Sequence, residues 1–172
     1  PDWPAAWRYV EETLRQSEKS RDHYLMGIGH QFIAGGFAYE AVTEEVPEEY
    51  EEKAKEVIEH LEKAISHFLL VCQHGLAAQS HAGIVEEHIR FAEHETDPKR
   101  KRAFLQQAVK LGRKGSEYTS LSGPGWRMTI CHSLSKALFF LSETEPNLSE
   151  KKRLLEEAAD LREKTIRIGD QL

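Results

Sequence analysis

The sequence predicts an all-α fold of about seven helices, paired into antiparallel hairpins. Apolar residues recur at intervals of three and four, as they do along one face of a helix. No stretch shows the sustained polar–apolar alternation that is typical of a half-buried strand. Each proline suits a helix boundary, and the six prolines lie at positions 1, 4, 47, 98, 124 and 146.

The individual helices follow from these patterns. We expect them over residues 3–18, 22–43, 47–74, 78–95, 98–118, 125–143 and 148–170. The third carries an apolar stripe that includes Leu61 and Phe68, and we expect Gly75 to end it. Asn147 and Ser149 are candidate N-caps of the last helix, because both side chains can accept hydrogen bonds from unpaired backbone amides.

Length and charge narrow the class of protein. A chain of 172 residues fits one domain, and 40% hydrophobic with 30% charged residues is typical of a globular protein. The net charge is −6, which disfavours nucleic acid or an anionic membrane as partner, since phosphate binding needs clustered Lys and Arg. The basic run 99–102 is short, and we interpret it as a solvated helix turn.

The two cysteines and the apolar segments indicate a cytoplasmic protein. Cys72 and Cys131 form no metal-binding or disulfide framework, so we expect two reduced thiols. The most apolar stretch, residues 24–42, is interrupted by His30, Gln31 and Glu40 and does not qualify as a membrane span. The chain begins with Pro1 and shows no signal peptide, and we expect it to be a segment of a longer polypeptide.

A repeat of about 50 residues is the most informative feature of the sequence. Residues 95–98, Glu-Thr-Asp-Pro, precede an amphipathic run at 101–108, and residues 143–146, Glu-Thr-Glu-Pro, precede a similar run at 151–158. A weaker copy begins at 44–47. A single helical hairpin cannot bury its own apolar face, so we expect the hairpins to stack.

The tandem hairpins resemble the tetratricopeptide (TPR-like) family, in a variant with hairpins longer than the usual repeat of about 34 residues. The resemblance covers residues 22–171 and implies a short right-handed solenoid in one domain, 1–172. It also implies a binding or scaffold role, as in regulatory proteins. We expect an N-terminal capping helix at 1–21 and hairpins at 22–75, 78–119 and 125–171.

Histidine is unusually frequent, and its spacing is regular. Seven of the nine histidines fall into two series with steps of seven residues, which return a helix to nearly the same face. They are His23 and His30, then His60, His67, His74, His81 and His88. No histidine follows an acidic residue by three positions, as in helical metal sites, so we predict no metal and no cofactor. The rings either border the core or line a groove.

A groove is the first functional hypothesis. In a TPR-like array the first helix of each hairpin faces the concave surface, where a protein or peptide would bind. Here these helices are 22–43, 78–95 and 125–143, and neutral histidines with a few arginines suit an acidic or polar peptide or a small anion. The predicted groove residues are His23, His30, His81, His88, Arg90, Arg127 and His132.

Two alternatives remain open at this stage. Arg127 and His132 resemble the Arg-x(4–6)-His motif of HEPN-type ribonucleases, in which histidine transfers protons and arginine stabilises phosphate charge. The chain departs from that motif at Met128, where a polar residue is usual. The other alternative is a sensor or oligomerisation domain, in which Trp3 and Trp7 contact a second chain instead of capping their own.

Overall fold

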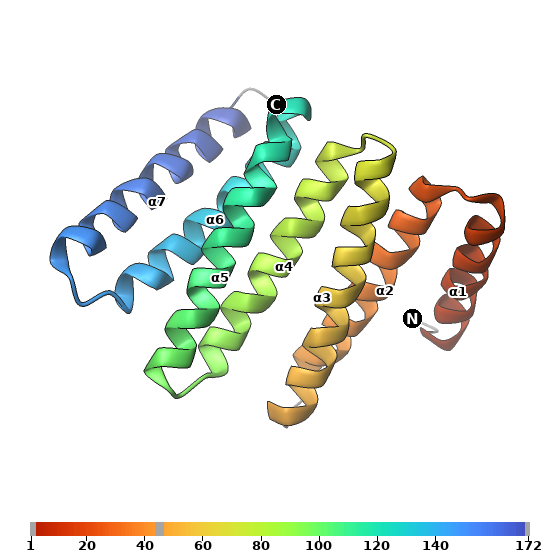
Figure 1. Cartoon of the computed structure of the whole chain (residues 1–172), viewed down its shortest axis with the longest axis horizontal. Helices are drawn as coiled ribbons and strands as arrows, with labels where there is room; N and C mark the ends of the chain where they lie inside the picture. Colours follow the sequence, from red (N-terminus) through yellow and green to blue (C-terminus); the bar gives the residue numbers. More distant parts are fainter. Residues whose placement is uncertain (1–2, 44–46, 171–172) are drawn as a thin grey trace.

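The computed structural model describes residues 3–43 and 47–170, with the side chains of 7–41 and 50–170. This part of the chain holds seven α-helices, a short 3₁₀ helix (η1) and no strand, so the all-α prediction is confirmed (Figure 1). The elements are α1 (Trp3–Ser20), α2 (His23–Thr43), α3 (Pro47–Leu70), α4 (His74–His94), α5 (Pro98–Glu117), η1 (Tyr118–Leu121), α6 (Pro124–Glu143) and α7 (Leu148–Gly169).

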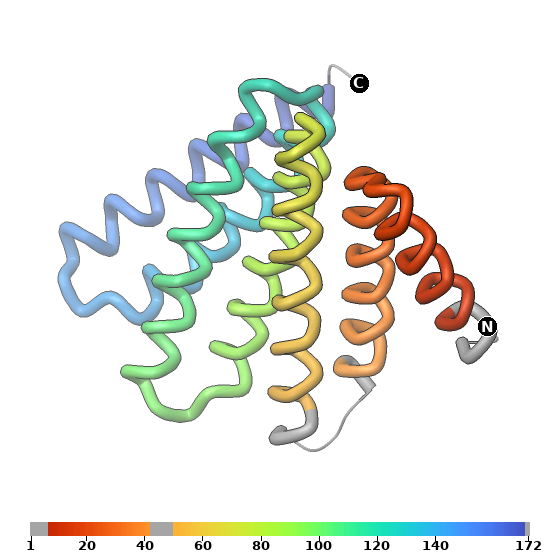
Figure 2. Tube along the Cα trace, turned by 45° about the vertical axis from the view of Figure 1, so that its right-hand side comes forward, coloured from red at the N-terminus to blue at the C-terminus, as the bar shows by residue number. Residues whose placement is uncertain are grey.

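Each helix packs against the next one in the sequence. The closest packing joins α2 to α3, α4 to α5 and α6 to α7. In Figure 1, α2 and α6 lie behind α3 and α5, and the tube in Figure 2 shows α1 at the edge of the molecule beyond α2. Within the described residues α4 also packs closely on α6, whereas α2 does not pack closely on α4. A gap between α2 and α4 is therefore built into the arrangement.

The positions at which the helices begin show the same repeat as the sequence. The first helices of the three pairs begin at residues 23, 74 and 124, and the second helices begin at residues 47, 98 and 148. Both series advance by 51 and then by 50 residues, which agrees with the period seen in the sequence. A residue of the first pair therefore corresponds to the residue 51 positions later in the second pair.

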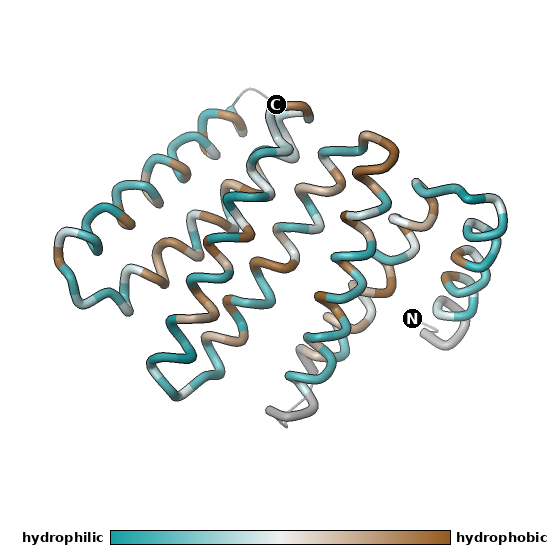
Figure 3. The backbone as a smooth tube through the Cα atoms, viewed as in Figure 1, coloured by the Kyte–Doolittle hydropathy of each residue, from teal (hydrophilic) through white to brown (hydrophobic). Residues whose placement is uncertain are grey.

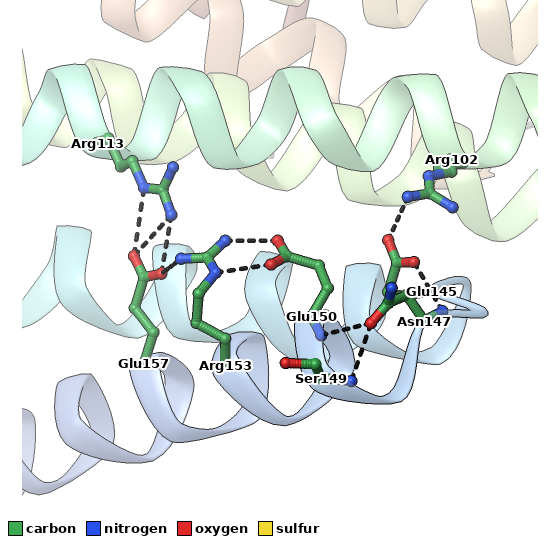
Figure 4. Close-up of polar contacts among 8 residues, drawn as sticks. All are labelled: Arg102, Arg113, Glu145, Asn147, Ser149, Glu150, Arg153 and Glu157. Carbon is green, nitrogen blue, oxygen red and sulfur yellow. Dashed lines mark hydrogen bonds and ion pairs between the residues drawn. The ribbon is translucent and has the colours of Figure 1, made fainter.

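The turns before α5 and α7 are fixed by equivalent pairs of side chains. Glu95 accepts a hydrogen bond from the amide of Asp97, and Asp97 caps α5 by accepting one from the amide of Lys99, both at 2.9 Å. Glu145 and Asn147 repeat this arrangement at α7 (Figure 4). Asn147 is thus the N-cap of α7, and the alternative, Ser149, lies inside the helix.

Gly75 does not end the third helix, and this prediction is wrong. Helix α3 ends at Leu70, and the turn that follows contains Cys72 at φ 56°, in the left-handed region. Gly75 lies in the first turn of α4, where an added Cβ would be 2.4 Å from Cδ1 of Trp126. The glycine is needed because the indole of Trp126 packs directly on the α4 backbone.

The apolar core runs through the layers between the helix pairs, while exposed helix faces are largely polar (Figure 3). Ile89, Leu105 and Leu138 join α4, α5 and α6 in its largest cluster, and Phe68 is central to the cluster of α2, α3 and α4. Burying a large apolar side chain contributes about 2 kcal/mol, so these layers supply the main stabilisation.

Helix α1 docks on α2 by fitting large side chains over glycines. A Cβ added at Gly36 would lie 2.6 Å from Trp7, whose ring is also 5.4 Å from the ring of Phe37. Trp7 therefore packs on its own chain, as a cap would. The side chain of Trp3 lies outside the described residues, so the predicted pairing of both tryptophans with a second chain stays a hypothesis.

Ion pairs join α5 to α7 on the outer side of the last two helix pairs (Figure 4). Arg113 contacts both carboxylate oxygens of Glu157, at 2.8 and 2.9 Å, and Arg153 links Glu157 to Glu150. Arg102 of α5 contacts the nearly buried Glu145 before α7. These contacts fix the register of the last helix against its neighbour.

Candidate functional site

The seven predicted groove residues do not gather on one surface. His23 and His30 turn toward α3, and His81 is buried beneath η1. His88 bonds the carbonyl oxygen of Ile84 in its own helix, at 3.0 Å. The remaining three separate as well: Arg90 lines a cavity between α2 and α4, Arg127 bonds the carbonyl oxygen of Thr119, and His132 lines a cavity between α6 and α7.

Two histidine pairs cross the interface between α2 and α3. Nδ1 of His23 lies 3.0 Å from Nδ1 of His67, and Nδ1 of His30 lies 2.9 Å from Nδ1 of His60. In both pairs the ring centroids are 2.2 Å farther apart than the nitrogens, so the two Nδ1 atoms face each other along the line between the rings. Each pair thus shares one proton, one ring donating Nδ1–H and the other accepting.

This head-on geometry is that of a hydrogen bond. A metal ion bound to both nitrogens would sit between them about 2 Å from each and would hold them farther apart. Within the described residues, no three His, Cys, Asp or Glu side chains group closely enough to hold a metal ion.

Burial favours the neutral form of His30, His60 and His67. The pKa of His30 is lowered to about 4, chiefly by desolvation and also by the neighbouring rings of His60 and His67 and the ammonium of Lys63. Desolvation likewise lowers the pKa of His60 and of His67. The charged form is disfavoured because it would lose hydration, and the nearby carboxylates of Glu18, Glu56 and Glu59 offset this loss only in part.

A second stack of rings repeats the first one. The ring centroids of His23 and His30 lie 5.2 and 5.7 Å from that of His67, and 51 residues later those of His74 and His81 lie 6.2 and 5.6 Å from that of Tyr118. His81 is 2% exposed, and neither of its ring nitrogens has a hydrogen-bond partner in the described part of the chain. Burial lowers the pKa of His81 to about 4.

An apolar groove lies between α2 and α4, with α3 beneath it. We call it the α2–α4 groove; its volume is about 600 Å³, within the usual range of ligand sites. Phe32 stands at its edge with 67% of its surface exposed. Small residues of α2 and α4 are part of its lining, and a Cβ added at Gly35 would meet no atom within 4 Å. The apolar lining residues are Ile28, Phe32, Ala34, Gly35, Ala38, Val57, Leu61, Leu76 and Gly83.

Polar residues mark the floor and one end of this groove. Gln31 of α2 donates a hydrogen bond to Oγ of Ser80 on α4, at 2.9 Å, and so spans the gap. At the end, the buried Glu87 pairs with Arg90 at 2.5 Å and accepts a longer bond from the Tyr50 hydroxyl, at 3.5 Å. Desolvation raises the pKa of Glu87, and Arg90 opposes that shift.

A second cavity, the α6–α7 pocket, has a volume of about 570 Å³. Its lining combines cationic and apolar side chains, namely His132, Ser135, Lys136, Phe139, Phe140, Leu155, Ala158, Ala159 and Arg162. Lys136 contacts Glu86 at 2.8 Å, and Glu86 lines the α2–α4 groove. This ion pair makes the two cavities neighbours.

Arg127 and His132 point in different directions. Five residues along a helix correspond to a rotation of about 140° from the starting face. The Arg127 guanidinium turns back to the carbonyl oxygen of Thr119 in η1, at 3.3 Å, whereas His132 lies in the α6–α7 pocket. In this geometry each side chain has separate neighbours.

Comparison with known proteins adds no assignment. No family model, curated protein or solved structure matches this chain. None of the helices in the described residues is long and apolar enough to cross a bilayer. The function therefore has to be argued from the two cavities.

Most of the residues that build the cavities were not predicted from the sequence. Of the seven predicted residues, Arg90 and His132 line a cavity, whereas Phe32, Gly35 and Arg162 were not among them. One pattern on α2 was visible in the sequence: Leu25, Phe32 and Tyr39 lie seven residues apart, all three are exposed in the structure, and Phe32 lines the groove.

Proposed function

We propose that this chain is a binding module that takes an amphipathic helix of a partner protein into the α2–α4 groove. The observation that carries the proposal is the exposed Phe32 beside an open, mainly apolar groove of about 600 Å³. Monomeric proteins rarely leave such surface uncovered without a binding role. The TPR-like arrangement expected from the sequence supports a module of this kind in a cytoplasmic protein.

The groove has the features that favour a helical partner. Exposed apolar residues at seven-residue spacing on α2 form a seam of the kind that packs along a second helix. The small residues Gly35, Ala38 and Gly83 allow a partner backbone to approach closely. Gln31 and Arg90 supply polar groups that fix its position.

The test begins with a displayed library of helical peptides selected against the intact chain. A selected peptide is then titrated against Phe32→Ala, which removes the exposed anchor, and Gly35→Leu, which adds a side chain at a position where a Cβ would meet no atom within 4 Å. We expect at least a tenfold loss of affinity in both, the usual cost of removing an aromatic anchor. Leu121→Ala is the matched control, since Leu121 is equally exposed in η1, outside the groove.

Hydrogen exchange locates the bound peptide independently. The proposal expects added protection along the groove faces of α2 and α4. It fails if the library yields no peptide, or if selected peptides bind the Phe32, Gly35 and Leu121 variants equally well.

A further inference from the structure

The α6–α7 pocket is lined by basic side chains, although the chain as a whole is acidic. The chain has 29 acidic and 23 Lys and Arg side chains, yet no carboxylate is among the described residues that line this pocket. His132, Lys136 and Arg162 line it instead. Such a local reversal of charge favours an anionic ligand.

The three basic side chains are not equivalent. Lys136 is held by Glu86 at 2.8 Å, so its charge is largely balanced. Arg162 is exposed on α7 and makes no ion pair within the described part of the chain, and His132 is exposed across from it on α6. One unbalanced guanidinium with an imidazole beside it suits a single negative charge, and a guanidinium binds a carboxylate with two parallel hydrogen bonds.

The remaining lining suits an apolar body. Phe139 is 47% exposed and meets Phe140 edge to face, with ring centroids 5.8 Å apart. Leu155 of α7 is 38% exposed on the opposite wall. A flat aromatic or short alkyl group placed between these walls would remove their apolar surface from water.

We infer that the α6–α7 pocket is a binding site for a small organic monoanion, a carboxylate or sulfonate with an aromatic or alkyl body. The anionic group pairs with Arg162 and accepts a hydrogen bond from His132. The body packs between Phe139 and Leu155. This site is separate from the α2–α4 groove and does not depend on peptide binding there.

The test titrates the intact chain with 2-naphthoate and with its neutral counterpart, 2-naphthylmethanol, followed by amide chemical shifts. We expect saturable binding of 2-naphthoate, with shifts centred on α6 and α7, and at least tenfold weaker binding of the alcohol. Acetate, which has the carboxylate but no large apolar group, should bind weakest. Equal binding of naphthoate and the alcohol, shifts centred on α2 and α4, or no saturation would each overturn the inference.

Two arginine variants distinguish binding in the pocket from a general effect of positive charge on the protein surface. Arg162→Gln should weaken 2-naphthoate at least tenfold and leave the alcohol unchanged, because only the ion pair is removed. Arg167→Gln is the matched control: it lies on the same helix, is exposed and pairs with Glu163 at 2.6 Å. The inference is wrong if the two variants weaken naphthoate equally. Peptide binding in the α2–α4 groove should be the same in both, so failure of one proposal leaves the other standing.

Discussion

At the scale of single residues, the histidines act as packing groups whose chemistry depends on remaining neutral. A shared-proton pair such as His30 and His60 can hold one extra proton, because a protonated ring still donates Nδ1–H to its partner. A second proton would set two donors against each other and break the bond. His81 has no partner for either nitrogen, and it stays neutral because nothing compensates its charge.

The first prediction concerns the pH dependence of stability. The folded pKa values of His30 and His81, about 4, lie below the ordinary value of 6.5, so the unfolded chain binds more protons between these limits. Their contribution is therefore complete above about pH 6.5 and is lost as the pH falls toward 4. We expect the thermal midpoint to fall steadily from pH 7 to pH 5, measured by circular dichroism.

Replacing the orphaned ring tests its share of this effect. His81→Leu removes two unpaired buried nitrogens and keeps an apolar side chain of similar size, so the midpoint at pH 7 should be unchanged or higher. The fall between pH 7 and pH 5 should become shallower. His94→Leu, at an exposed position on the same helix, is the control and should leave the slope in place. A slope unaffected by His81→Leu would contradict this account.

At the scale of elements, the sequence located the helices well where capping residues and prolines mark their starts. Helix α5 was expected at 98–118 and spans Pro98–Glu117, because Asp97 and Pro98 form a cap whose chemistry is local. The boundary between α3 and α4 was predicted wrongly because Gly75 is not a helix terminator. It is a glycine because Trp126, 51 residues away in the chain, packs against it. Contacts at that distance leave no local pattern.

The same distinction explains the candidate site. The apolar spacing of α2 was visible in the sequence, but which of its faces remains uncovered depends on the gap between α2 and α4. Heptad-spaced histidines suggested a lining, yet His23 and His30 find partners in α3 instead. Pair formation between helices cannot be deduced from the spacing on either helix alone.

A prediction at this scale concerns the cap of α7. Asn147 accepts hydrogen bonds from the amides of Ser149 and Glu150, so Asn147→Ala should lower the free energy of unfolding by about 1 kcal/mol. Urea titration measures this change. Ser149→Ala is the control, because its exposed side chain lies after the cap, and it should change stability much less. Equal losses in both variants would show that Asn147 has no special role.

At the scale of the whole molecule, the helices form two groups with one main connection. Helices α4 to α7 are cross-linked by the packing of α4 on both α5 and α6, whereas α1, α2 and α3 follow one another in a simple chain. The packing of α3 on α4 joins the groups. The largest core cluster lies entirely within α4 to α7.

This asymmetry predicts an order of local opening. Amide exchange should be fastest in α1, which packs closely only on α2 within the described residues, intermediate in α2 and α3, and slowest in α4, α5 and α6. Exchange measured by mass spectrometry on the intact chain checks the order. Uniform protection across all helices would show instead that the molecule opens as one unit.

The sparse contact between α2 and α4 also has a mechanical consequence. We expect a small rotation of α3 against α4 to move α2 away from α4 and so to widen the groove, because α2 packs mainly on α3. The hydrogen bond from Gln31 of α2 to Ser80 of α4 opposes this widening. A bulky ligand would then require this hydrogen bond to break, whereas a slender ligand would not. Substituting Gln31 or Ser80 should therefore change which ligands the groove accepts without changing the helices themselves.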